Sequence, residues 1–193
     1  TADHAVAQLE ERLSAQGFTK LFEYDRWSLQ SGGKYYVTRN GSSLIAFTIP
    51  SGDTVSDYRV VSAHTDSPSF KLKDRFERSS DNYSKLNVEK YGGMICSSWL
   101  DRPLSIAGRV LLSDEQGIKT RLVNFDRPMA IIPNVAIHMD RSANDGKSYN
   151  AQVDMLPITG IATDNGSFKK VLRELTHLTK KCLHFIRASV KVC

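Results

Sequence analysis

His64 and Asp66 stand two residues apart at the end of the apolar run VVSAHTDSP, residues 60–68. The run predicts a short, buried β-strand over residues 57–64, ended by a proline. Residues i and i+2 of a strand point to the same side, so the imidazole and the carboxylate are expected to face one way. They would lie at the carboxyl end of the strand, which is where open α/β sheets bind ligands.

The chemistry that this pair suggests is metal binding. A carboxylate beside an imidazole can fix its tautomer and ring orientation, an arrangement common around zinc. Catalytic zinc sites usually take three protein ligands and a water. His64 is therefore a candidate zinc ligand, and Asp66 a candidate orienting carboxylate. The same spacing fits a structural His–Asp pair, so spacing alone leaves both interpretations open.

The elements that would position this pair are a helix and a hairpin. Residues 3–18 have Val6, Leu9 and Leu13 at helical spacing, with Asp3 as a possible N-cap and a glycine after the last turn. In residues 35–50, two β-type runs flank Asn40-Gly41, a dipeptide that tolerates positive φ. Together with the strand at 57–64, these elements predict a mixed α/β arrangement.

After residue 70 the pattern changes to short β-type runs separated by turn signals. Their spacing favours an antiparallel unit. The runs cover residues 85–93, 104–112, 118–126 and 129–140. A surface loop is expected over 142–154.

A helix is predicted over residues 168–186, because its apolar residues share one helical face. We accordingly divide the chain into residues 1–75, a β-rich domain at 76–165, and a basic helical tail at 166–193. The helical face would carry Phe168, Val171, Leu172, Leu175, Leu178 and Cys182.

The net charge of +5 comes from this tail. Residues 1–165 carry 19 Lys and Arg against 20 Asp and Glu, whereas residues 166–193 carry seven against one. A neutral body gives no electrostatic case for nucleic-acid binding. No apolar run approaches the roughly 18 residues of a membrane span. Three cysteines without metal-site or disulfide-framework spacing favour a cytoplasmic location.

Several motifs together resemble the aspartyl aminopeptidase family of zinc exopeptidases. The resemblance runs from about residue 3 to about residue 175, in the family's order. It implies an α/β fold: an incomplete zinc-exopeptidase-like catalytic domain with an inserted, mainly antiparallel β dimerisation domain. The motifs are SAHTDSP at 62–68, YGG at 91–93, WLDRPLSIAGRV at 99–110 and IPNVAIHMDR at 132–141.

The resemblance also implies residue roles. His64 matches a histidine that binds one of two zinc ions, and Asp66 the carboxylate that orients it. His138 matches a histidine of the inserted domain that reaches the neighbouring subunit's active site and contacts substrate. Such enzymes remove one N-terminal residue, usually acidic, from peptides by metal-assisted hydrolysis, and they form homodimers or larger homo-oligomers.

The family's remaining metal-site motifs do not appear in these 193 residues. Glu10-Glu11 lies on the first predicted helix, and Asp164-Asn165 lacks the glutamates that follow it in the family. We therefore expect an N-terminal fragment with a tail of uncertain origin, inactive alone. The alternatives are a non-catalytic oligomerisation module or inactive short paralogue, and a binding protein that uses the basic tail. Asp101 is interpreted as structural, because Asp-Arg-Pro commonly forms a turn with an internal ion pair, and Trp99 as a core or interface residue.

Overall fold

The computed structural model describes residues 1–52, 57–162, 168, 170–171, 174 and 183–192. The chain forms two compact units, Thr1–Ser67 and Pro68–Cys193. The boundary that the sequence analysis places near residue 75 lies inside the first strand of the second unit.

The first unit begins with helix α1, Ala2–Ala15. Thr1 is its N-cap, with Oγ1 accepting a hydrogen bond from the His4 amide at 3.5 Å. The prediction of Asp3 as N-cap is therefore wrong; its carboxylate lies in the first turn, where the helix dipole favours negative charge. Val6 is buried, and Gly17, with a φ of 77°, follows the helix as predicted.

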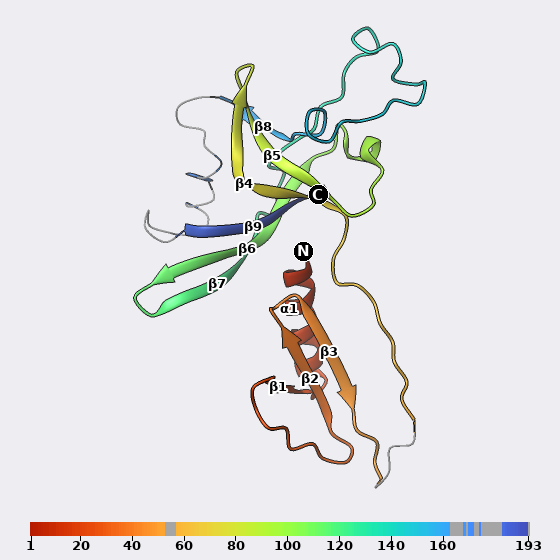
Figure 1. Ribbon diagram of the computed structural model, residues 1–193, viewed down its shortest axis with the longest axis vertical. Coiled ribbons are helices and arrows are strands. Elements are labelled where there is room, and N and C mark those ends of the chain that lie inside the picture. Colours follow the sequence, from red (N-terminus) through yellow and green to blue (C-terminus); the bar gives the residue numbers. More distant parts are fainter. Residues whose placement is uncertain (53–56, 163–167, 169, 172–173, 175–182, 193) are drawn as a thin grey trace. The chain divides into compact units, whose positions relative to one another are not determined.

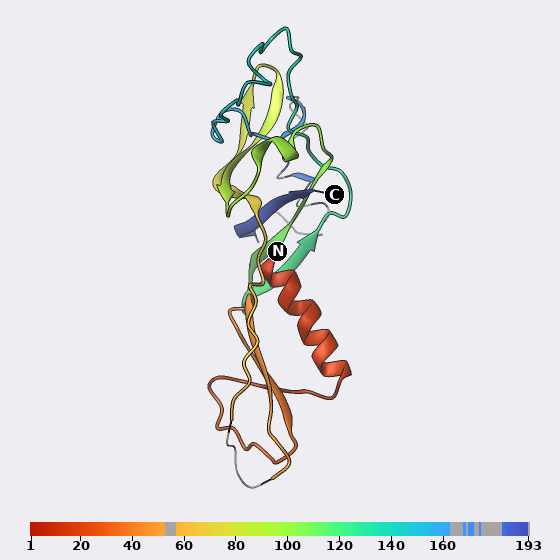
Figure 2. The ribbon, with the colours of Figure 1, turned by 90° about the vertical axis from the view of Figure 1, so that its right-hand side faces the viewer.

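A three-stranded sheet packs beside α1 (Figures 1 and 2). Strand β1, Thr19–Leu21, pairs in parallel with β2, Lys34–Arg39, and β2 pairs antiparallel with β3, Ser43–Thr48. The predicted hairpin is confirmed. Asn40 and Gly41 have φ values of 53° and 64°, the conformation that an Asn-Gly turn adopts readily.

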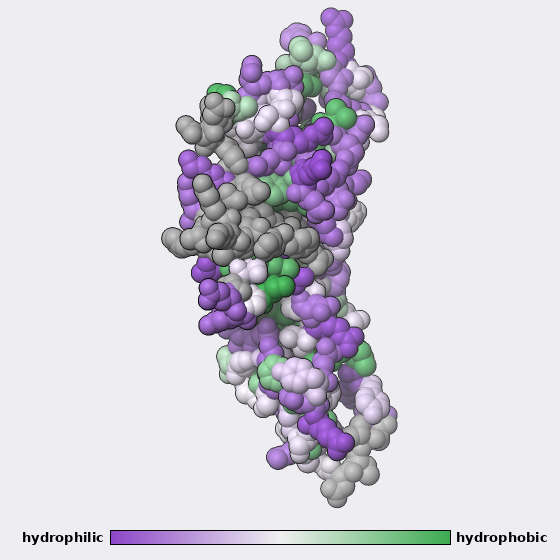
Figure 3. All heavy atoms as spheres, turned by 60° about the vertical axis from the view of Figure 1, so that its left-hand side comes forward, coloured by the Kyte–Doolittle hydropathy of each residue, from purple (hydrophilic) through white to green (hydrophobic). Residues whose placement is uncertain are grey.

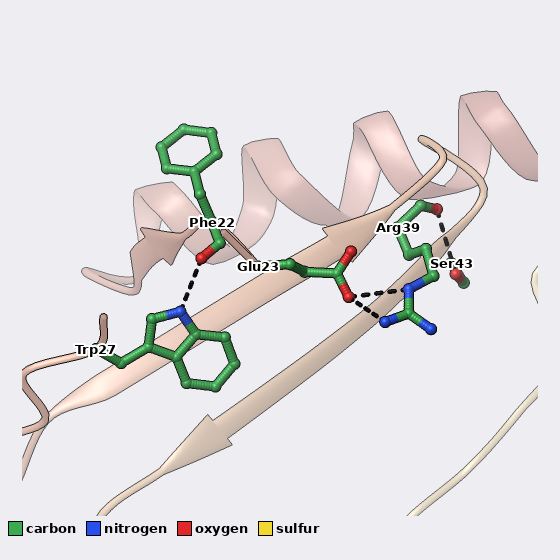
Figure 4. A network of polar contacts seen from close by, with 5 residues as sticks. All are labelled: Phe22, Glu23, Trp27, Arg39 and Ser43. Carbon is green, nitrogen blue, oxygen red and sulfur yellow. Dashed lines mark hydrogen bonds and ion pairs between the residues drawn. The ribbon is translucent and has the colours of Figure 1, made fainter. Parts of the chain in front are cut away.

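The two faces of this sheet are covered by different parts of the chain. The Tyr36 hydroxyl lies 3.1 Å from that of Ser14, so this side chain faces α1. Its neighbour Tyr35 points to the other face, where its ring packs on Phe47. Trp27 stacks on Phe47 and donates from its indole nitrogen to the Phe22 carbonyl at 2.8 Å, as Figure 4 shows for the latter contact. The segment between β1 and β2 is thereby fastened over the sheet.

The same segment is fastened by an ion pair between Glu23 and Arg39 (Figure 4). Nε and Nη2 of Arg39 both donate to Glu23 Oε1, at 2.9 and 2.5 Å. The hydrogen bond from Arg39 holds the pKa of Glu23 below its ordinary value of 4.5. Because the folded pKa is lowered, the stabilising contribution is complete above pH 4.5 and is lost as the pH falls through the folded value.

Arg39→Gln is therefore expected to raise the pKa of Glu23 back toward 4.5. Carbon-13 NMR titration of the Glu23 carboxyl group measures this directly. Arg12→Gln makes the same arginine-to-glutamine change on α1. It serves as the control and should leave the pKa of Glu23 unaffected. Equal titration of Glu23 in wild type and Arg39→Gln would contradict the ion pair.

The second unit is built on a six-stranded sheet in which every pairing is antiparallel (Figure 1). Its strands are β4 Ser69–Ser80, β5 Tyr83–Tyr91, β6 Leu104–Asp114, β7 Gly117–Asn124, β8 Ile158–Ile161 and β9 Leu183–Val192. A short 3-10 helix, Cys96–Trp99, follows β5. The order of the strands in the sheet is β7-β6-β9-β4-β5-β8.

Strand β4 contains an irregularity that redirects it. Leu72 pairs with Val88, but the next pair is Glu77 with Leu86, so β4 has extra residues between the two pairs. Such bulges bend a strand and increase its twist. Phe76 lies within the bulge and is buried, with its ring edge-on to Phe168 at 5.8 Å. The bulge thus delivers an aromatic side chain to the core.

The hydrophobic core of this unit lies on one face of the sheet. Phe70 is fully buried and meets the Trp99 ring edge-on, with centroids 5.1 Å apart. Trp99 is therefore a core residue, as interpreted from the sequence. Alternate residues of the central strands supply most of the remaining core. It contains Leu72, Phe76, Leu86, Val88, Leu104, Ile106, Phe125, Ala130, Ile132, Met155, Phe168 and Val190.

Three predicted elements are corrected. Residues 57–64 form no strand, and residues 129–140 form only isolated bridges and turns. The basic tail is not helical at its end, because residues 183–192 are strand β9 between β6 and β4. The rest of the predicted helical face, Leu172, Leu175, Leu178 and Cys182, lies outside the described residues, whereas Phe168 and Val171 are helical.

Figure 3 shows mainly hydrophilic side chains on the face drawn, with hydrophobic ones in small separate groups. Single exposed apolar residues of this kind are ordinary on protein surfaces. Among the described residues, no helix has both the length and the apolar character needed to cross a membrane.

Candidate functional site

His64 and Asp66 are brought together as the sequence predicts. Nδ1 of His64 lies 2.7 Å from the backbone oxygen of Asp66 and 3.2 Å from its Oδ1. Both neighbours are acceptors, so they favour the tautomer that carries its proton on Nδ1. That tautomer leaves the lone pair of Nε2 available to a metal. The His64 side chain is 80% exposed, so the ring is accessible.

The pair lies in an extended segment that contacts the hairpin. Thr65 Oγ1 donates to the Ser42 carbonyl at 2.9 Å, just after the Asn-Gly turn. The described residues 57–63, just before His64, form no strand, and Val60 and Val61 are 84% and 98% exposed. The physical reason is pairing: a strand requires a hydrogen-bonded neighbour, and the part of the chain that the structure describes provides none at 57–64.

The side chains around His64 do not form a complete set of zinc ligands among the described residues. Within the described residues, no group of three or more His, Cys, Asp or Glu side chains could hold a metal ion. Zinc in a catalytic site takes three protein ligands. His64 has the correct tautomer preference for one of them, but the described residues do not by themselves fit a zinc ion.

His138 is in the second unit and lies in a turn, not on a β-strand. The turn spans residues 137–139 and is closed by the Met139 amide, which donates to the Ala136 carbonyl at 2.8 Å. His138 is exposed, and so are its neighbours Ile137 and Met139. The imidazole is therefore presented at the surface of this unit, flanked by apolar side chains.

Asp101 holds the start of the segment that leads to this turn. Its amide donates to the Ile132 carbonyl at 2.9 Å, and its Oδ1 accepts from the Asn134 amide at 2.8 Å. Its φ of 55° is in the left-handed region, which Asp tolerates better than most residues. The structural interpretation of Asp101 is supported, although its carboxylate binds a backbone amide and not the arginine beside it.

The family model for aminopeptidase I zinc metalloproteases (M18) matches residues 1–192 of the chain. The chain therefore belongs to the M18 family. It is 46% identical over 168 residues to a probable M18 family aminopeptidase 2 of Clostridium novyi, covering 85% of this chain and 39% of that protein. The chain spans about two fifths of the length of the curated relatives it matches.

Solved structures show the same fold. The structure titled as the complex of Ape4 and Nbr1 matches with a TM-score of 0.88 and 34% identity, over 100% of this chain and 41% of the other. The S. cerevisiae mApe1 dodecamer matches with a TM-score of 0.75 and 26% identity, over 100% of this chain and 45% of the other. The chain has an α/β fold with a mainly antiparallel β unit, and it matches 41% and 45% of these two solved chains.

These matches correct the interpretation of the tail. The resemblance expected from the sequence ends near residue 175, but the family model continues to residue 192, and β9 is a central strand. A sequence pattern that predicts this strand was present. Apolar residues alternate with polar ones at the period of a strand, at Ile186, Ala188, Val190 and Val192.

Proposed function

We propose that this chain forms part of a zinc-dependent aminopeptidase that removes an N-terminal, preferably acidic, residue from peptides. In this proposal His64 is a ligand of one of two zinc ions, with Asp66 orienting its ring. The remaining ligands come from outside the described residues. The observation that supports the proposal best is the pair of contacts at His64 Nδ1, because they prepare Nε2 for a metal.

His138 is proposed to contact bound substrate in the active site of a second subunit. Its position in an exposed turn of the β unit supports this role, since the ring is accessible there. An imidazole near the reacting carbonyl can hold developing negative charge, which is typically worth a few kcal/mol. The dodecameric assembly of the S. cerevisiae relative supports a homodimer or larger homo-oligomer here. A cytoplasmic location remains part of the proposal, supported by the three cysteines without disulfide spacing.

The test is a peptidase assay on the protein expressed from its own locus. We expect release of the N-terminal residue from aspartyl and glutamyl peptides, loss of this activity with a zinc chelator, and recovery on adding zinc. Leucyl and lysyl peptides of equal length measure the preference for acidic residues. Activity that survives complete removal of metal would refute the zinc proposal.

The 193-residue chain alone is expected to be inactive in the same assay, because its described residues do not fit a zinc ion. If the chain alone were to release residues in a metal-dependent way, its ligand set would be more complete than proposed. The alternative function, a non-catalytic oligomerisation module, would be favoured if the protein expressed from its locus assembled but hydrolysed no peptide.

A further inference from the structure

The turn that carries His138 lies between two attachment points in the second unit. On its N-terminal side, the segment is held by Asp101 through the Asn134 amide. On its C-terminal side, the first strongly bonded side chain is Asp140, two residues after His138. Residues 135–139 between these points are all exposed. The freedom of the backbone that carries the imidazole therefore depends on how firmly both points are held.

Asp140 uses both carboxylate oxygens. Oδ1 accepts from the Ser142 hydroxyl at 2.8 Å and from the Ser142 amide at 3.2 Å. Oδ2 lies 2.5 Å from Nζ of Lys147. The Asp140 carbonyl also accepts from the Ala143 amide at 3.3 Å. Asp140 therefore ties together three residues that follow the His138 turn.

Lys147 connects this group to the core. Its Nζ lies 5.5 Å from the centroid of the Tyr149 ring. Tyr149 packs against the hydrophobic core of the second unit. The His138 turn is thus connected to the core through Tyr149, Lys147 and Asp140, and Asp140 is two residues from His138 along the backbone.

The Asp140 carboxylate is better shielded than the carboxylate of the Lys85–Asp81 pair in the same unit. The side chains of Asp140 and Lys147 are 19% and 26% exposed, whereas Asp81, the partner of Lys85, is 83% exposed. Hydrogen bonds from Lys147 and Ser142 lower the pKa of Asp140, and the bond to Asp140 raises the pKa of Lys147. Both directions favour the charged pair, and shielding from water strengthens it.

We infer that Asp140 and Lys147 are positioning residues for His138: their ion pair fixes the C-terminal side of the His138 turn to the core. This inference deepens the proposed function and rests on it for the role of His138 in catalysis. Neither residue needs to touch substrate. Their effect is to limit the movement of the backbone that carries the imidazole, which matters because small displacements of a positioned group can cost large factors in rate.

The first test uses NMR on the 193-residue chain, without metal or substrate. Lys147→Met removes the charge and keeps most of the length. We expect amide hydrogen exchange at Met139 and Ser142 to become about ten-fold faster, as for loss of a hydrogen bond to a charged group. The His138 ring carbon should show greater motion on the picosecond to nanosecond timescale.

Two further variants make the result specific. Lys147→Arg keeps the charge and should restore slow exchange and the ordered ring. Lys85→Met breaks the exposed pair with Asp81 and should leave both signals unchanged. Unchanged amides at Leu86 and Ile106 show that the fold is intact. If the motion of the His138 ring and the exchange rate of the Met139 amide were the same in wild type and Lys147→Met, the inference would be overturned.

The second test separates this inference from the proposed function. In the protein expressed from its own locus, Lys147→Met is expected to lower kcat about ten-fold, with KM and zinc content unchanged. If His138→Ala lowers kcat and Lys147→Met does not, the positioning inference is wrong. If His138→Ala itself leaves kcat unchanged, the proposed role of His138 is wrong, while the NMR result still decides whether the ion pair orders the turn.

Discussion

His64→Ala is expected to lower zinc affinity at one metal position by at least about 100-fold in the protein expressed from its own locus. Changing only an outer partner of a zinc ligand typically costs about 10–100-fold, and this substitution removes the proposed ligand itself. Peptidase activity at limiting zinc should fall by a similar factor. Competition with a chromogenic chelator measures the affinity, and the peptide assay measures the activity.

Asp66→Ala should have a smaller effect, closer to ten-fold. The reason is the second contact at His64 Nδ1: the backbone oxygen of residue 66 lies 2.7 Å away and remains after the side chain is removed. Long-range proton–nitrogen NMR spectra of the His64 ring should show a weaker preference for the proton on Nδ1. Asp25→Ala, at an exposed carboxylate of the same unit, is the control. Equal losses for His64→Ala and Asp66→Ala would contradict this assignment of roles.

Phe70→Ala is expected to lower the free energy of unfolding of the second unit by about 3–5 kcal/mol. Phe70 is fully buried in β4, where it faces Val190 of β9 in register and Trp99 edge-on. Removing the ring leaves a cavity between two central strands and removes an aromatic contact that is worth about 0.5–1.5 kcal/mol beyond its buried area. A loss of this size is a large part of the stability of a small domain.

Fluorine NMR of 5-fluorotryptophan-labelled protein in urea would follow unfolding at Trp99 separately from Trp27. Ile95→Ala is the matched control, because Ile95 is 74% exposed and lies just before the 3-10 helix that carries Trp99. It should change the unfolding free energy by less than about 0.5 kcal/mol. An effect of Phe70→Ala as small as that of the control would show that β4 and β9 do not pack as described.

Local sequence was enough to predict several elements of the fold. The helix at Ala2–Ala15 and the hairpin around Asn40-Gly41 depend on residues near one another in the chain, so spacing and turn chemistry predict them. The proximity of His64 and Asp66 is local for the same reason. The antiparallel character of the second unit followed from short β-type runs with turn signals between them.

Elements that depend on distant partners were predicted less well. The bulge in β4 separates Leu72 from Phe76 and breaks the alternation that would mark a single strand. Residues 57–64 are apolar enough for a strand, yet no described segment pairs with them. Nothing in the sequence marked Lys147 as a partner of Asp140, because their contact arises only when the loop folds back on itself.

The sequence by itself determined the family, the hairpin and the His64–Asp66 pair, because each is carried by motifs within a few residues. The tertiary structure alone decided the place of residues 183–192. Their net positive charge suggested a solvated helix, but β6 and β4 offer backbone partners on both sides, and the alternating apolar residues then bury Val190 in the core. The alternation of residues 186–192 was a local signal for a strand, but only pairing with β6 and β4, about 70–120 residues earlier in the chain, placed that strand inside the sheet.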